Sequence, residues 1–352
     1  MLIFYLLLLV IPLLFVKKRK DDDLSIMDSY STTCIKGVLC LYVVLHNLGL
    51  DYEGNSEAME LICEHTGGIG VGVFFFLSAF GIIRSYQHKG NKYLKKLLFV
   101  NVVKLYLISV SINLLTYFVF FQGSFETKDL LFRIFNLDVF NNFNRMNRHG
   151  WYISVIIGLY IIFAIVYYLC SKLKTKNKFI IAGFILAFIS ISFRIGAKIA
   201  DNGGMYTREM PCFAIGCLYA TYYDKVNNLS KKYYWPSIWI TIVAFILGFI
   251  FFEPIGAYAT CLFLIVVSQR ITYKNNVTYF LGKLCIYIYL FVHFSSLVMQ
   301  PFITNQYWWI INNLGLILEL SLIFFTLEYG VRYLIKKLIK HKENIKIKEG
   351  GI

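Results

Sequence analysis

The sequence predicts an all-α membrane protein, a single polytopic bundle of about eleven transmembrane helices. Three observations predict this fold class. Hydrophobic residues make up 58% of the 352 residues and charged residues only 16%, against roughly 25% in soluble domains. Long apolar runs recur along the chain. Basic residues gather in every second segment between these runs.

Each predicted span is an apolar run near the roughly 20 residues that a helix needs to cross a bilayer. The first run is short, and the eighth and ninth are joined only by Glu253 and Pro254. We find no internal repeat and no linker long enough to separate domains. In chain order, the predicted spans are 2–16, 34–50, 68–86, 98–121, 150–170, 178–197, 209–223, 235–252, 255–269, 278–299 and 307–331.

The distribution of Lys and Arg predicts the orientation. With the amino terminus outside and the carboxyl terminus in the cytoplasm, 25 of the 35 Lys and Arg residues face the cytoplasm and 6 lie in external segments. Cytoplasmic loops of membrane proteins carry such an excess. The net charge of +15 therefore indicates membrane lipid as a partner. It does not indicate nucleic acid, because the chain has no soluble basic domain to bind it.

We divide the chain into three parts. Residues 1–30 are an N-terminal membrane anchor with a basic cytoplasmic linker, 31–335 are the transmembrane domain, and 336–352 are a basic cytoplasmic tail. The basic run follows the first apolar segment, and no small-residue cleavage site precedes it. This order favours a retained, reversed anchor over a cleaved signal peptide. Whether the protein forms a homo-oligomer stays open.

The eight cysteines predict neither a disulfide framework nor a metal site. All except Cys63 lie in a predicted span or at its edge, so no external pair is available. No Cys–His spacing is typical of zinc, and we expect no metal.

Ionisable side chains inside spans are candidate functional residues, because a charge in lipid is costly. Lys36 and His46 lie at the cytoplasmic and external ends of the second span, roughly 15 Å apart along a helix. A cation facing the cytosol and an imidazole facing outward suit a reaction supplied from one side and completed on the other, with His46 as general base. The structural alternative is a lysine reaching the headgroups and a histidine hydrogen-bonded between helices. His293 is the second candidate base.

The third span ends in a cluster of five cations. Before them, glycines at short spacings predict close helix packing, and Ser78 has no base adjacent in sequence that would make it a nucleophile. The cations could hold the phosphates of a nucleotide-containing donor, or they could be ordinary cytoplasmic positive charge. They are Arg84, Lys89, Lys92, Lys95 and Lys96.

Six stretches in order resemble the acyltransferase-3 family of bacterial membrane proteins, which typically O-acetylate polysaccharides, lipids and peptidoglycan. The first pairs a basic residue with a histidine, and the third is a basic segment. The other four match the family's patterns Phe-Phe-x-x-Ser-Gly-Phe, Trp-Phe/Tyr, Arg-x-x-Pro-x-Phe-x-x-Gly and Leu-Gly-Lys…His. In this chain they are Lys36 to His46, Gly72 to Phe80, Lys92 to Leu97, Trp151 to Tyr160, Arg208 to Gly216 and Phe280 to His293.

The resemblance implies about ten core helices behind an extra anchor, a cytoplasmic acyl-CoA donor, usually acetyl-CoA, and an acceptor outside. His46 would be the catalytic histidine, as base or as carrier of the acyl group. The donor's phosphates would be bound by Lys36, Lys95 and Lys96, to which we add Arg84. The external site would be shaped by Trp151, Tyr152 and Arg208, to which we add Asn47 and Ser78 as substrate-binding candidates.

Three departures from the family pattern bear on the site. The basic residue and the histidine are usually eleven residues apart and here ten, so on a helix Asn47, not His46, lies beneath Lys36. Cys285 and Ile286 replace the common Ser-Tyr. Lysines stand where arginines are usual, and they lack the bidentate guanidinium fork. An inactive or repurposed member is therefore an alternative.

The sequence thus predicts an O-acetyltransferase that modifies a hydroxyl of an envelope polysaccharide or glycolipid. One alternative is a lipid-linked glycan flippase or exporter, for which two-fold repeats would be expected, and we find none. Another is a glycan polymerase, which would place a large external loop at its active site, whereas the longest external segment here is 122–149.

Overall fold

The computed structural model of the chain describes residues 16–19, 27–52, 57–120, 131, 134–135, 151–175, 177–199, 207–251, 253–302 and 305–349. Nearly all of these residues are helical, which confirms the predicted all-α class. The elements are β1 (Lys17–Lys18), α2 (Ser29–Asp51), α3 (Glu57–Lys89), α4 (Asn91–Lys96), the π-helical turn η2 (Leu97–Val102), α5 (Val103–Phe120), α7 (Trp151–Ser171), α8 (Lys178–Ile199), α9 (Met210–Thr221), α10 (Tyr223–Lys232), α11 (Tyr234–Phe251), α12 (Glu253–Val267), β2 (Ile271–Thr272), α13 (Asn276–Met299) and α14 (Gln306–Glu349).

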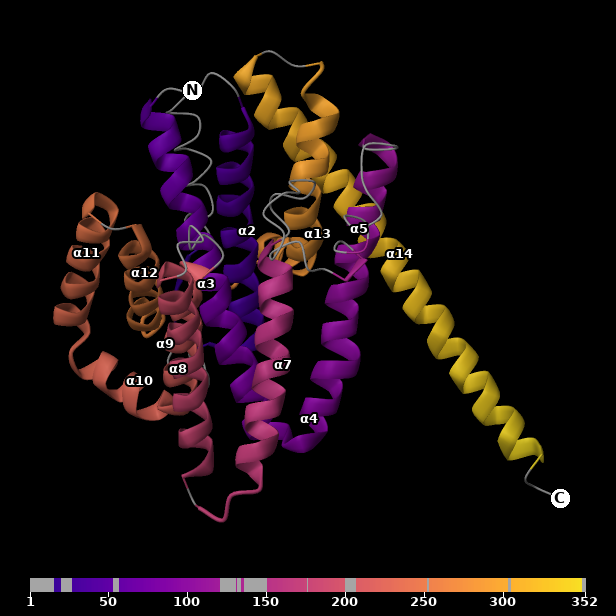
Figure 1. Cartoon of the computed structure of the whole chain (residues 1–352), viewed down its shortest axis with the longest axis horizontal. Helices are drawn as coiled ribbons and strands as arrows, with labels where there is room; N and C mark the ends of the chain where they lie inside the picture. The colour runs from indigo at the N-terminus through magenta and orange to yellow at the C-terminus, as the bar shows by residue number, and fades with distance from the viewer. Residues whose placement is uncertain are drawn as a thin grey trace.

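Helices α2, α3 and α13 form the centre of the bundle. Helix α2 packs between α3 and α13, and α3 also contacts α9 and α12. Helices α11 and α12 pair at one margin of the molecule and α14 packs on α13 at the other (Figure 1). The two central helices that carry most of the predicted site residues, α2 and α3, are therefore enclosed by other helices.

Ten of the eleven predicted spans coincide with helices. Among the described residues, seven helical stretches are long and apolar enough to cross a membrane, and α9, α11 and α12 supply three shorter apolar ones. The predicted span at 2–16 lies outside the described residues, apart from its last residue. Large apolar side chains on the outer helices are exposed, among them Phe188, Trp239 and Leu327, as a lipid-facing surface requires.

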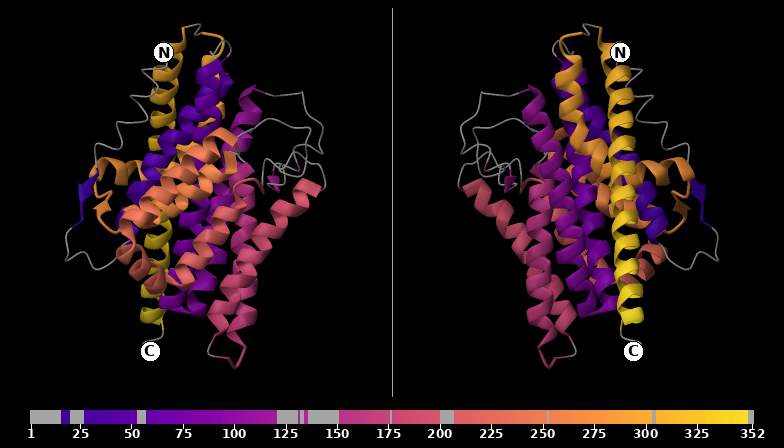
Figure 2. Two further views of the ribbon diagram at one scale, coloured as in Figure 1. Left: turned by 90° about the vertical axis from the view of Figure 1, so that its left-hand side faces the viewer. Right: turned by 90° about the vertical axis from the view of Figure 1, so that its right-hand side faces the viewer.

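The bundle has two distinct ends. We call the end that contains the start of α2, the end of α3, α4 and the turn between α7 and α8 the basic end. The end of α2 at Asp51 lies toward the opposite end, and the start of α7 at Trp151 lies nearer the middle of the bundle (Figure 1). The carboxyl-terminal part of α14 reaches toward the basic end, as both side views show (Figure 2). In the predicted orientation, the basic end faces the cytoplasm.

Two segments differ from the sequence prediction in their secondary structure. The predicted loop 224–234 is mostly helix α10, which buries Asn227 and Ser230 and leaves its lysines exposed. Asn227 accepts hydrogen bonds from Tyr219 (3.0 Å) and Gln269 (2.9 Å). Helix α14 continues to Glu349, beyond the predicted end of the last span at 331. Span prediction measures apolar length, whereas Lys and Glu also favour helix.

The basic segment before α2 is held against the loop between α12 and α13. Strands β1 and β2 pair antiparallel, with Lys17 opposite Thr272. The Arg19 guanidinium donates to the carbonyl of Ser268 at 3.1 Å. This pairing fixes the approach of the chain to α2 at the basic end.

Helices α2 and α13 cross at two glycines. A Cβ added to Gly37 would lie 2.0 Å from the carbonyl oxygen of Thr278, and one added to Gly282 would lie 1.9 Å from that of Thr33. Only glycine permits such an approach, which is typical of packed membrane helices. The crossing brings the helix of Lys36 and His46 against the helix of Cys285 and Tyr289, whose residues line the site.

Candidate active site

Three cavities follow one another between the basic end and the opposite end. Their volumes are about 520, 130 and 50 Å³. Lys36, Ser78 and Tyr160 line both the first and the second cavity. Val71 and Tyr289 line both the second and the third. We name them the basic cavity, the middle cavity and the His46 cavity.

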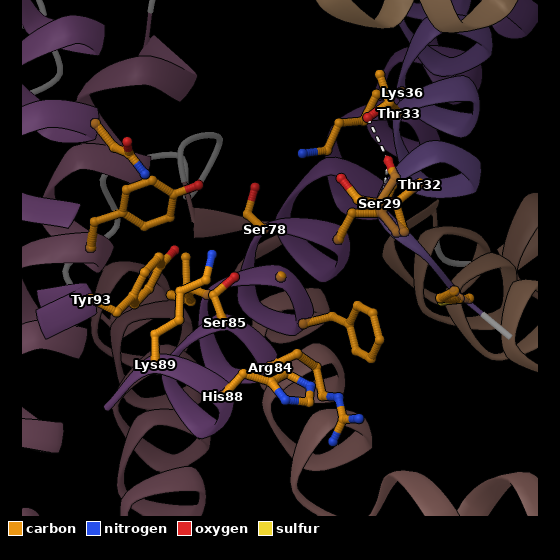
Figure 3. A pocket seen from close by; sticks show the side chains of 17 residues that line it. Ser29, Thr32, Thr33, Lys36, Ser78, Arg84, Ser85, His88, Lys89 and Tyr93 are labelled. Carbon is orange, nitrogen blue, oxygen red and sulfur yellow. Dashed lines mark hydrogen bonds between the residues drawn. The ribbon is translucent and has the colours of Figure 1, made fainter. Parts of the chain in front are cut away.

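Among the described residues, the basic cavity is lined by cations and hydroxyl groups and by no Asp or Glu. Its cations come from the start of α2 and the end of α3, and Lys36 and Lys89 extend into it from opposite sides, with Ser78 near them (Figure 3). The Arg84 guanidinium lies 4.5 Å from the centre of the Tyr223 ring. Charge-assisted hydrogen bonds from such groups suit a ligand with several phosphates. The polar lining residues are Ser29, Thr32, Thr33, Lys36, Ser78, Arg84, Ser85, His88, Lys89, Tyr93, Asn101 and Tyr160.

The middle cavity is polar at its boundary with the basic cavity and largely apolar elsewhere. The hydroxyls of Ser78 and Tyr152 lie 3.4 Å apart. The Tyr152 ring packs on Phe75, with ring centres 4.9 Å apart, and on Tyr289, at 5.9 Å. The apolar lining residues are Val71, Phe74, Leu105, Ile153, Ile156 and Ile286. Cys285 also lines this cavity.

A π-helical turn positions the chain beside the first two cavities. In η2 each turn takes in an extra residue, and such turns are frequent at functional sites. Asn101 within the turn lines the basic cavity, and Leu105 one turn later lines the middle cavity. One short segment thus contributes to both compartments.

The His46 cavity brings together residues from five parts of the chain, namely α2, α3, α7, the segment before α9, and α13. His46 and Asn47 come from α2, Trp151 begins α7, and Arg208 and Glu209 precede α9. Arg208 and Glu209 form an ion pair, and the Glu209 side chain is only 2% exposed. The Tyr258 hydroxyl donates to the Arg208 carbonyl at 2.9 Å and so fixes the backbone there.

The ring of His46 is held by close packing as well. A Cβ added to Gly67 would lie 2.2 Å from the imidazole carbon Cδ2. The imidazole therefore rests on the backbone of α3 in the same cavity as a buried carboxylate. A carboxylate near a histidine stabilises the imidazolium that forms when the ring accepts a proton.

A family model described as an acyltransferase domain matches residues 30–329, which cover nearly the whole chain. The chain belongs to the acyltransferase-3 family. No curated protein and no solved structure gives a significant match to it. The three cavities are therefore those of a membrane acyltransferase.

Most of the predicted site residues of this acyltransferase lie on the three cavities. Lys36 and Arg84 line the basic cavity, and Ser78 and Tyr152 line the middle cavity. The predicted external residues share the His46 cavity, namely His46, Asn47, Trp151 and Arg208. Despite the ten-residue spacing from Lys36, His46 and Asn47 both reach the same cavity. The roles assigned to these residues stay predictions.

Three predicted residues do not line these cavities. Lys95 and Lys96 are exposed on the short helix α4, beyond the mouth residues His88 and Lys89. His293 lies one helical turn after Tyr289 on α13, past the part of that helix that lines the middle and His46 cavities. Their proposed roles in donor binding and as reserve base remain untested.

The acyltransferase site also contains residues that sequence reasoning did not select. Glu209 adjoins Arg208 within the quoted family stretch, and its charge at the first position of the predicted span 209–223 was the available signal. Lys89 was counted in the cation cluster without being preferred to Lys95 or Lys96. Tyr289 lies within the quoted family stretch Phe280 to His293, but it was not selected from among the 26 tyrosines of the chain. Among the described residues, no three His, Cys, Asp or Glu side chains gather as a metal site.

Proposed function

We propose that this acyltransferase moves a short acyl group, acetyl in the simplest case, from cytoplasmic acyl-CoA to a hydroxyl of an extracytoplasmic envelope polysaccharide or glycolipid. The observation that carries the proposal is the row of three wall-sharing cavities, which runs from a cationic compartment to an imidazole at the opposite end. Such a row suits a donor and an acceptor that approach from different sides of a membrane.

The basic cavity supports the choice of donor. Coenzyme A carries several phosphates on a nucleotide, and Lys36, Arg84 and Lys89 supply cations without any carboxylate among the lining residues. A volume of about 520 Å³ lies within the roughly 300–1,000 Å³ range of small-molecule sites. The thioester at the end of the long pantetheine arm would enter the middle cavity past Lys36 and Ser78.

The His46 cavity supports the acceptor half of the reaction. His46 would remove the proton from the acceptor hydroxyl while its oxygen attacks the thioester carbonyl. The new C–O bond replaces the C–S bond, and the coenzyme A thiolate leaves with the proton that the imidazole took up. Glu209 would stabilise the imidazolium in between, and Trp151 would pack against the sugar ring, as aromatic residues commonly do.

The test measures transfer directly. Inside-out membrane vesicles that contain the full-length protein receive acetyl-CoA labelled in the acetyl group, and the label in alkali-labile esters of the envelope glycan is counted. Wild type should incorporate label, and His46→Ala should lose most of it, because a general base contributes about 10²- to 10⁴-fold. His293→Ala serves as the matched variant, a histidine lost from the same bundle but away from the three cavities.

Three results would contradict the proposal or its assignment of the base. Full incorporation by His46→Ala would exclude this imidazole as base or carrier. Export of glycan without any labelled ester, in wild type, would favour the transporter alternative. Loss in His293→Ala with activity retained in His46→Ala would move the base to α13.

A further inference from the structure

The chemistry of the middle cavity changes along its length. Where it meets the basic cavity, it presents the hydroxyls of Ser78 and Tyr160. Its other walls are mostly aliphatic and aromatic, and Ile153 and Ile156 on α7 are almost fully buried. A thioester likewise combines a polar carbonyl with an apolar chain.

The size of the middle cavity limits what it can hold. Its volume is about 130 Å³, somewhat below that of an apolar cavity of about 150 Å³ that holds the six carbons of benzene. An acetyl group contains three non-hydrogen atoms and leaves space unfilled, whereas an extended hexanoyl group, with seven, exceeds the space.

We propose that the middle cavity is the acyl compartment of this enzyme and that Ile156 and Ile286 set the longest chain it accepts. This inference rests on the proposed function and names its acyl class: uncharged groups of two to about four carbons. Charged acyl groups such as succinyl are disfavoured, because among the described lining residues the only cation is Lys36, at the boundary with the basic cavity, and desolvation of a carboxylate is unfavourable.

Ile156 and Ile286 are the residues whose size is tested. They face the cavity from α7 and α13, on two different helices, and neither carries a polar group. Because a methylene in an apolar pocket changes kcat/KM by about 10- to 200-fold, shortening or enlarging one wall residue should shift the preference measurably. Ile288 on α13 is the matched control, since it is buried but lines none of the three cavities.

The experiment compares acetyl-, propionyl-, butyryl-, hexanoyl- and succinyl-CoA as donors for the purified full-length protein in lipid nanodiscs. Wild type should use the first three, and hexanoyl- and succinyl-CoA should have kcat/KM values lower by about tenfold or more. Ile286→Ala and Ile156→Ala should raise use of hexanoyl-CoA by about tenfold, and Ile286→Phe should restrict the enzyme to acetyl-CoA. Ile288→Ala should leave the order of donors unchanged.

Cys285 supplies a second measurement that needs no acceptor. It lines the middle cavity, so alkylation by N-ethylmaleimide, located by peptide mass spectrometry, should be slowed by acyl-CoA. Protection should rise from acetyl- to butyryl-CoA in wild type and extend to hexanoyl-CoA in Ile286→Ala.

The outcomes separate the two proposals. One outcome is that acyl-CoA donors are used with the same order of preference for chain length in Ile286→Ala, Ile286→Phe and wild type. That result overturns the assignment of the middle cavity as the acyl compartment, while the proposed function stands. If no acyl-CoA of any length is used or protects Cys285, both proposals are overturned.

Discussion

The imidazole of His46 lies directly against the backbone of Gly67, so closely that a Cβ added there would come within 2.2 Å of ring carbon Cδ2. Gly67→Ala must therefore push the ring out of its position in the His46 cavity. We expect transfer to fall by about 100-fold, since a displacement of about 1 Å at a catalytic group can cost that much. Acetyl transfer by purified protein measures the loss.

The matched control for this change is Gly158→Ala on α7. No atom lies within 4 Å of a Cβ added to Gly158, and the residue lines none of the three cavities. Both variants should be recovered folded. Full activity in Gly67→Ala would mean that the position of the His46 ring does not matter for transfer.

We expect Glu209 to stabilise the imidazolium of His46 without acting as the general base itself. Glu209→Gln keeps the size of the side chain but removes the charge that pairs with Arg208 and stabilises an imidazolium. We predict that kcat falls by about 10- to 100-fold with little change in the KM for acyl-CoA, because the donor's phosphates are proposed to bind in the basic cavity. An equal rise in KM would assign Glu209 to donor binding instead.

Most helices of this protein could be predicted from the sequence because each is encoded by the apolar residues of its own segment. Apolar runs of sufficient length gave ten spans that coincide with helices, including the short α9, α11 and α12. Helix α10 was missed as a helix because its signal is amphipathic periodicity at helical spacing, not apolar length. The same limitation ended the last span at 331, although α14 continues in charged residues.

The site could be predicted only in part. Family stretches identified His46, Trp151 and Arg208, and these do share a cavity. Their meeting in one cavity depends on the rotation and depth of three separate segments, which no local pattern encodes. The contact of Gly67 with His46 is of this kind, and so is the burial of Glu209. Lys95 and Lys96 show the converse, since their charge was visible in the sequence but their exposure on α4 was not.

The crossing of α2 and α13 should tolerate no side chain at Gly282. A Cβ there would lie 1.9 Å from the Thr33 carbonyl oxygen, a backbone atom that cannot rotate away. We expect Gly282→Ala to lower stability by about 1–3 kcal/mol or more, as overpacking does. Thermal unfolding in detergent measures it. Gly315→Ala on α14, with nothing within 4 Å, should behave as wild type, and an equally stable Gly282→Ala would contradict the close crossing.

Glu328 joins three helices through its carboxylate. It pairs with Lys104 of α5 at 2.9 Å and with Arg332 of its own helix, and it accepts a hydrogen bond from the Tyr287 hydroxyl of α13. Glu328→Gln leaves Lys104 without its counter-charge in an apolar setting, and we expect a loss of about 1–3 kcal/mol. Thermal unfolding of Glu319→Gln, the same change at an exposed position of α14, should match wild type. Equal stability of the two variants would show that the three-helix link contributes nothing.

Asp28 makes the start of α2 sensitive to acid. Its burial opposes ionisation, but hydrogen bonds from the Ser31 backbone and from Lys274 outweigh this and lower its pKa below the ordinary 3.8. Because folding lowers this pKa, the ionised carboxylate contributes its full stability above pH 3.8, and the contribution is lost as the pH falls through the lowered value. Asp28→Asn retains an oxygen that can accept the Ser31 N–H and loses only the ion pair, whereas Asp28→Ala also loses the cap, worth about 1 kcal/mol. Thermal unfolding at pH 7 should therefore rank wild type above Asp28→Asn and Asp28→Ala lowest. The difference in unfolding temperature between wild type and Asp28→Asn should become smaller as the pH approaches 3. If that difference stays constant, the Asp28 charge does not stabilise the fold.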